Sequence, residues 1–174
     1  MRQFFICNQS EIESKLKTLS KRGTSAESWT DYYYDKNSNE EWLLTRYDSE
    51  YHGGGVSVLK MLPEPSIEEL IDIAMTSLSK NDIRGASLEL SEREKINKDD
   101  FRSKLLDKLL QVDTSSLNDF EKERLKTIIY ESNLYDATNR RNIVGKHFTE
   151  IEKDADYFRT ISEKAKAILS IMAE

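Results

Sequence analysis

The sequence is poor in the residues that cross-link or interrupt a chain. Its 174 residues include one cysteine, two prolines and six glycines. A single cysteine cannot form a disulfide within the chain, which fits a reducing compartment. Hydrophobic residues make up 37% of the chain and recur in regular stripes, so we expect a folded protein rather than a disordered one.

Long apolar runs are also missing. Residues 1–10 contain the apolar stretch 4–7 and nothing longer, so we expect neither a signal peptide nor a membrane anchor. No later segment approaches the roughly 20 apolar residues that a transmembrane helix needs. We therefore expect a cytoplasmic protein, and its length fits a single domain spanning residues 1–174.

Negative charge is concentrated in the middle of the chain. Residues 1–25 carry five basic and two acidic groups, residues 26–100 carry eight and seventeen, and residues 101–174 carry thirteen of each. Nucleic acid is excluded as a partner for the middle section, because binding to phosphates requires the opposite sign. A basic protein partner would be attracted to it.

The spacing of apolar residues along the chain predicts a mainly α-helical fold with a small antiparallel β-sheet, in three parts. A capping box at Ser10 and Glu13 predicts an N-terminal helix in residues 1–25, ending near Gly23. Residues 28–62 alternate and contain many aromatics, which predicts a three-stranded meander with Trp42 and Leu44 on one face and a turn formed by residues 35–39. Beyond the prolines at 63 and 65, residues 66–174 show helical periodicity throughout.

Four helix starts are expected in that last part: Ser66 with Glu69, Asn81 or Asp82, Asn97 with Asp100, and Ser115 or Ser116. The residues predicted to face inward on these helices are Ile67, Leu70, Ile71, Ala74, Leu78, Ile83, Ala86, Leu90, Phe101, Leu105, Leu109, Phe120, Leu125, Ile128 and Ile129. Segments beginning at Ser66 and Asn97 superpose with an offset of 31 residues, so a HEAT-like stack of helical hairpins stands beside an ordinary bundle as an interpretation. From about Asn139 a heptad pattern, whose stripe begins with Val144 and Phe148, predicts one long helix. The chain is expected to be a monomer or a weak dimer.

The segment Asp48–Gly55 is the most unusual loop. Its His52-Gly53-Gly54-Gly55 run occurs in esterase oxyanion holes, but the chain lacks the Gly-x-Ser-x-Gly motif which that chemistry requires. Metal binding through Asp48, Glu50 and His52 is a second interpretation. A third interpretation is a sharp turn in which the glycines adopt positive φ angles. A fourth is a binding loop, because a backbone without Cβ atoms lets a partner approach closely. We expect no catalytic residue, no cofactor and no metal.

Aromatic residues crowd the same region, at positions 29, 32–34, 42, 47 and 51. The arrangement resembles immunity proteins of bacterial polymorphic-toxin systems over residues 28–65. The resemblance rests on Trp29-(x2)-Tyr32-Tyr33, Glu41-Trp42 and Glu50-(x)-His52-Gly53-Gly54-Gly55. It implies a small non-enzymatic protein that binds and neutralises a toxin.

We therefore predict a protein-binding module whose partner is a basic toxin domain. A helical scaffold in another complex and a metalloprotein or hydrolase that depends on His52 are the alternatives. Tyrosine and tryptophan are favoured as interface anchors, and carboxylates attract basic groups. The predicted partner-binding residues are Glu41, Trp42, Asp48, Glu50, Tyr51, His52, Gly53, Gly54 and Gly55.

Overall fold

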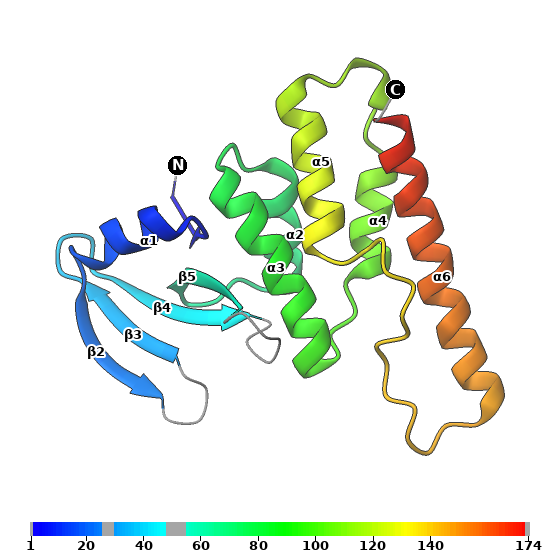
Figure 1. Ribbon diagram of the computed structural model, residues 1–174, viewed down its shortest axis with the longest axis horizontal. Coiled ribbons are helices and arrows are strands. Elements are labelled where there is room, and N and C mark those ends of the chain that lie inside the picture. Colours follow the sequence, from blue (N-terminus) through cyan, green and yellow to red (C-terminus); the bar gives the residue numbers. More distant parts are fainter. Residues whose placement is uncertain (1, 26–29, 48–54, 173–174) are drawn as a thin grey trace. The chain divides into compact units, whose positions relative to one another are not determined.

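The computed structural model of the chain describes residues 2–25, 30–47 and 55–172 (Figure 1). Within these residues it contains six α-helices and a five-stranded antiparallel sheet, which confirms the predicted α+β class. The chain divides into two compact units, Met1–Ala86 and Ser87–Glu174. The division falls inside a helix.

The first unit is built on the sheet, whose strand order is β1-β5-β4-β3-β2. The strands are β1 (Phe5–Ile6), β2 (Ser20–Ser25), β3 (Thr30–Asp35), β4 (Glu40–Tyr47) and β5 (Val56–Leu62). The three predicted strands correspond to β3, β4 and β5, and the turn formers after Asp35 connect β3 to β4 as expected. The two outer strands, β1 and β2, were not predicted from the sequence.

The predicted N-terminal helix is too long and begins at a different cap. Helix α1 spans Gln9–Leu16, and its cap is Asn8, whose side chain accepts hydrogen bonds from the amides of Ser10 and Glu11. The predicted Ser10–Glu13 capping box does not form. The residues that follow belong to β2, where Ser20 pairs with Tyr34 and Ser25 with Thr30.

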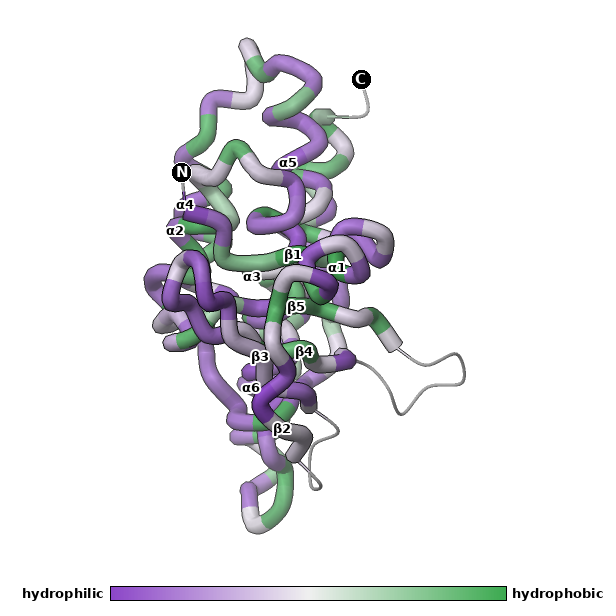
Figure 2. Tube along the Cα trace, turned by 90° about the vertical axis from the view of Figure 1, so that its left-hand side faces the viewer, coloured by the Kyte–Doolittle hydropathy of each residue, from purple (hydrophilic) through white to green (hydrophobic). Residues whose placement is uncertain are grey.

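One face of the sheet forms a core with α1. Its buried members are Ile6, Ile12, Trp42, Leu59 and Met61. Cross-strand pairing places Trp42 opposite Met61 and Leu44 opposite Leu59, so residues two apart on β4 share this face, as the alternation predicted. Figure 2 shows the difference in hydropathy between the strands: β5 is mostly hydrophobic (green), whereas the edge strand β2 is hydrophilic to neutral (purple to white).

Two helices follow the sheet. Helix α2 spans Ile67–Thr76, and the predicted capping box between Ser66 and Glu69 is present. Leu70, Ile71 and Ala74 are buried as predicted, whereas Leu78 lies beyond the end of α2 and is 69% exposed. Helix α3 spans Lys80–Asn97, and the predicted inward residues Ile83, Ala86 and Leu90 are buried.

The second unit contains α4 (Arg102–Leu110), a short 3-10 turn (Thr114–Ser116), α5 (Asp119–Glu131) and α6 (Phe148–Ile171) after the end of α3. The predicted inward residues Phe101, Leu105 and Leu109 are buried, and α4 contacts α6. Asn97 is the last residue of α3 rather than a helix start, so the expected correspondence between segments starting at Ser66 and Asn97 fails. Asn118, not Ser115 or Ser116, caps α5.

The last helix is long but shorter than predicted. It starts after His147, whose side chain accepts a hydrogen bond from the amide of Thr149, and not near Asn139. Val144 and Phe148, the first two residues of the predicted heptad stripe, are 83% and 67% exposed. The residues of α6 that are buried are Asp154, Phe158, Ile161, Ser162, Ala165 and Ile168. None of the helices described is long and apolar enough to cross a membrane.

Candidate functional site

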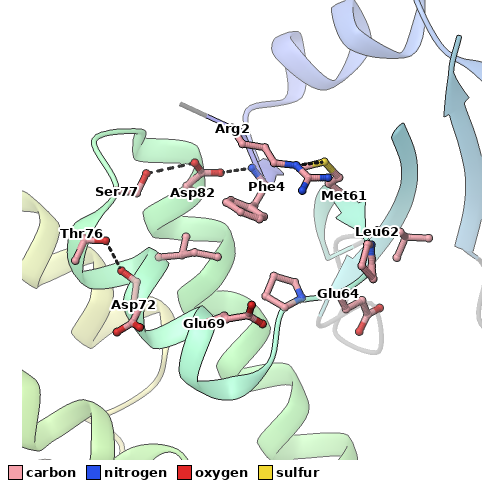
Figure 3. A pocket seen from close by; sticks show the side chains of 13 residues that line it. Arg2, Phe4, Met61, Leu62, Glu64, Glu69, Asp72, Thr76, Ser77 and Asp82 are labelled. Carbon is pink, nitrogen blue, oxygen red and sulfur yellow. Dashed lines mark hydrogen bonds between the residues drawn. The ribbon is translucent and has the colours of Figure 1, made fainter. Parts of the chain in front are cut away.

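A pocket of about 450 Å³ opens in the first unit between the N-terminal segment, the end of β5 and α2 (Figure 3). Part of its lining is apolar, from Phe4, Met61, Leu62, Pro63, Pro65 and Ile73. The remainder is polar and mostly acidic, with carboxylates from Glu64, Glu69, Asp72 and Asp82. Such a pocket suits an apolar group that carries positive charge.

A second depression lies next to this pocket. The two share Arg2, Leu62 and Pro63 in their linings, and the second adds Tyr34, Asn39, Glu40 and Glu41 from the β3–β4 hairpin. We refer to the pocket and this depression together as the acidic groove. Its described lining contains six carboxylates and the guanidinium of Arg2. Lys60 lies 2.8 Å from the Glu64 carboxylate, and the buried Asp82 carboxylate accepts backbone amides. The carboxylates that make the groove favour a cationic ligand are those of Glu40, Glu41, Glu69 and Asp72.

The N-terminal wall of the groove is held by the first residues of α3. One carboxylate oxygen of Asp82 accepts hydrogen bonds from the amides of Phe4 and Phe5, at 2.8 and 2.9 Å. The side-chain oxygen of Asn81 accepts from the amides of Cys7 and Asn8 in the same way. One of these two residues was predicted to cap α3. Instead, both side chains bind the backbone of the N-terminal segment, more than 70 residues earlier in the chain.

The opposite wall is a face of α2. Glu69 and Asp72 are three residues apart and therefore lie on the same side of the helix, as Figure 3 shows. The hydroxyl of Thr76 donates a 2.7 Å hydrogen bond to the backbone carbonyl of Asp72. The amide of Ser66 donates to the Glu69 carboxylate, which holds the pKa of Glu69 below its ordinary value. Glu69 is therefore negatively charged at neutral pH.

Arg2 lies where the two parts of the groove meet. Its Nε donates a 3.3 Å hydrogen bond to the sulfur of Met61, and it lies 3.7 Å from a carboxylate oxygen of Glu40. Its guanidinium carbon is 5.9 Å from the centre of the Phe4 ring. The side chain remains 57% exposed, so these contacts hold it on the surface rather than bury it.

The predicted site residues are distributed unevenly. Glu41 is exposed and lines the groove. Gly55 adopts a φ of +70° directly before β5, as expected for a glycine at a reversal. Trp42 is 2% exposed and packs under α1, so it is a core residue and has no surface to offer a partner. The other six, Asp48, Glu50, Tyr51, His52, Gly53 and Gly54, lie outside the described residues.

A second polar cluster occurs in the second unit. Arg141 contacts Asp100 at 3.0 Å and Asp154 at 2.6 Å, and the hydroxyl of Tyr157 donates to Asp100. The void beside this cluster measures about 10 Å³, which is room for one water at most. These charges compensate one another and hold residues 139–147 against α6, so we assign the cluster a structural role.

Within the described part of the chain, no group of three histidine, cysteine, aspartate or glutamate side chains is placed to hold a metal ion. Cys7 is buried. No family model, curated protein or solved structure matches the chain. The geometry of the groove therefore carries the functional argument.

Proposed function

We propose that this chain is a non-enzymatic, cytoplasmic protein-binding module that acts as an immunity protein and neutralises a basic toxin domain by binding it. The observation that carries the proposal is the acidic groove, whose described lining combines apolar side chains with the carboxylates of Glu40, Glu41, Glu69 and Asp72. The acidic residues of the groove belong to residues 26–100, where the chain has its excess of negative charge, and they line a concave surface that a protein segment can enter.

The groove offers both components of a protein interface. Phe4, Leu62 and Pro63 supply apolar surface for the stems of long side chains. Glu41, Glu69 and Asp72 supply charge for their ends. Complementary charge accelerates association and excludes acidic competitors, while apolar contacts slow dissociation. Neutralisation by this route needs no reaction: the module occludes basic groups that the toxin uses on its own target.

The direct test is capture of the product of the adjacent gene, together with its co-expression in cells. We expect this chain to retain that product on a column and to restore growth of cells that express it. Absence of both binding and protection would overturn the proposal.

Matched variants connect the result to the groove. Glu69→Gln removes a charge while a glutamine can still close the capping box, and Asp72→Asn removes the neighbouring charge. We expect the double variant to weaken binding by roughly tenfold or more at low salt, in the range that close charge pairs contribute. Glu163→Gln with Asp107→Asn is the control, because both residues are exposed on helices of the second unit. Equal affinities of the two double variants would exclude the groove as the site.

A further inference from the structure

The chain places a guanidinium of its own in the groove. Arg2 is the cationic side chain among the described residues that line the pocket and its neighbouring depression. Its Nε lies 3.7 Å from the carboxylate of Glu40. It also approaches the sulfur of Met61 and the ring of Phe4 (Figure 3). These contacts show which group the groove accommodates: a planar cation beside an aromatic ring and a carboxylate.

The contacts of Arg2 are weak. A thioether sulfur is a poor acceptor, and the 3.7 Å separation from Glu40 lies near the upper limit for an ion pair. More than half of the Arg2 side chain is exposed, and exposed ion pairs contribute little to stability. Arg2 can therefore leave the groove at small cost, whereas Phe4 is fixed by Asp82 through the backbone.

We propose that Arg2 occupies the place of an arginine side chain of the basic partner and that binding displaces it. This inference rests on the proposed function, and it names the group that the groove recognises. Arginine is favoured over lysine because its guanidinium is planar, stacks on an aromatic ring such as that of Phe4, and makes paired hydrogen bonds to carboxylates. Arg2 acts as an internal competitor that lowers the affinity for weakly basic proteins.

The first experiment removes the competitor. Arg2→Ala is titrated with a short amidated peptide of alternating arginine and leucine, by calorimetry at low salt. We expect its affinity to exceed that of the unmodified protein by about threefold to tenfold. Arg159→Ala is the control, since it removes an exposed arginine of α6 outside the groove lining. An Arg2→Ala affinity equal to that of the control, or lower than that of the unmodified protein, would overturn the inference.

The second experiment tests the identity of the side chain. The same peptide with lysine in place of every arginine has equal charge, and we expect it to bind at least about fivefold more weakly to Arg2→Ala. Equal binding of both peptides would show that charge alone is recognised and would overturn the inference. The two experiments can fail separately. If the chain captures the partner but binds both peptides equally, the inference is wrong and the proposed function stands. If it prefers the arginine peptide but captures no partner, only the proposed function is refuted.

Discussion

The amide of Phe4 donates a 2.8 Å hydrogen bond to the carboxylate of Asp82, which lies 78 residues further along the chain. The same oxygen accepts the amide of Phe5, and the hydroxyl of Ser77 donates to the other oxygen. Asp82 is 2% exposed, so its charge is compensated by these donors rather than by water. This arrangement sets the position of Phe4, and hence of one wall of the groove.

Replacing Asp82 tests that arrangement. Asp82→Ala leaves the amides of Phe4 and Phe5 without their acceptor, and each unsatisfied buried group costs about 1–3 kcal/mol. We expect the free energy of unfolding of the first unit to fall by about 2–5 kcal/mol and the amides of residues 4 and 5 to exchange with solvent much faster. Hydrogen exchange measures both effects. Asp107→Ala, at an exposed position of α4, is the control, and equal protection of residues 4 and 5 in both variants would contradict the assignment.

Gly85 provides a test in which two effects oppose each other. Alanine normally stabilises a helix relative to glycine by about 1 kcal/mol. A Cβ at Gly85, however, would lie 2.3 Å from the Cβ of Phe5, and neither atom can move without its backbone. We expect the clash to dominate, so that Gly85→Ala lowers the midpoint of chemical unfolding and costs at least about 2 kcal/mol.

Gly23→Ala is the matched control for that substitution. No atom lies within 4 Å of a Cβ built at Gly23, and we expect a change within about 0.5 kcal/mol. A Gly85→Ala protein as stable as the Gly23→Ala protein would show that β1 does not pack on α3 as described.

Local patterns predicted the central strands and most helix interiors. The alternation on β4, the capping box at Ser66 and the buried face of α4 all depend on neighbours within a few residues, and all three are confirmed. Strand β2 was missed because Lys21, Arg22 and Thr24 carry no apolar alternation. The partner strand β3, through pairs such as Lys21 with Tyr33, makes this segment extended.

The candidate site was less predictable than the fold. The groove combines residues 2–4, 34–41, 61–65 and 69–82, and no spacing in the sequence indicates that these segments meet. The pattern correctly placed Trp42 and Leu44 on one face of β4, but it could not show that α1 covers this face. The acid excess of residues 26–100 was the usable signal, and it identified Glu41.

Arg102 supports the irregular segment after α5. Its side chain is fully buried, binds the carboxylate of Glu94 at 2.6 and 2.8 Å, and donates to the backbone carbonyls of Asn133 and Asp136. Arg102→Met leaves a buried carboxylate unpaired, so we expect a loss of about 3–5 kcal/mol and rapid amide exchange in residues 133–136.

A double-variant cycle isolates this ion pair. Adding Glu94→Gln to Arg102→Met removes the stranded charge, and we expect the combined cost to be smaller than the sum of the two single costs by at least about 1 kcal/mol. Additive costs would show that the carboxylate contributes nothing beyond packing. Arg159→Met, at an exposed site on α6, should leave stability unchanged to within about 0.5 kcal/mol.

Asp136 makes the second unit sensitive to acid. Burial alone would raise the pKa of Asp136, but hydrogen bonds from Arg140 and Thr138 outweigh it and lower the pKa from 3.8 to about 2. A carboxylate with a lowered pKa contributes stability that is fully present above about pH 4 and is lost as the pH falls towards 2. We therefore expect Asp136→Asn to be less stable than the unmodified protein at pH 6, with a difference that shrinks steadily between pH 4 and pH 2.

Chemical unfolding at several pH values, followed by hydrogen exchange in residues 133–140, measures that difference. Asp107→Asn corrects for the general effect of removing an exposed carboxylate from the second unit. Because Asp136 also accepts the amide of Thr138, its loss should increase exchange at Thr138 first. A difference between Asp136→Asn and the unmodified protein that stays constant from pH 6 to pH 2 would show that the ionised form of Asp136 is not the stabilising species, and that Arg140 has no electrostatic role in holding this segment.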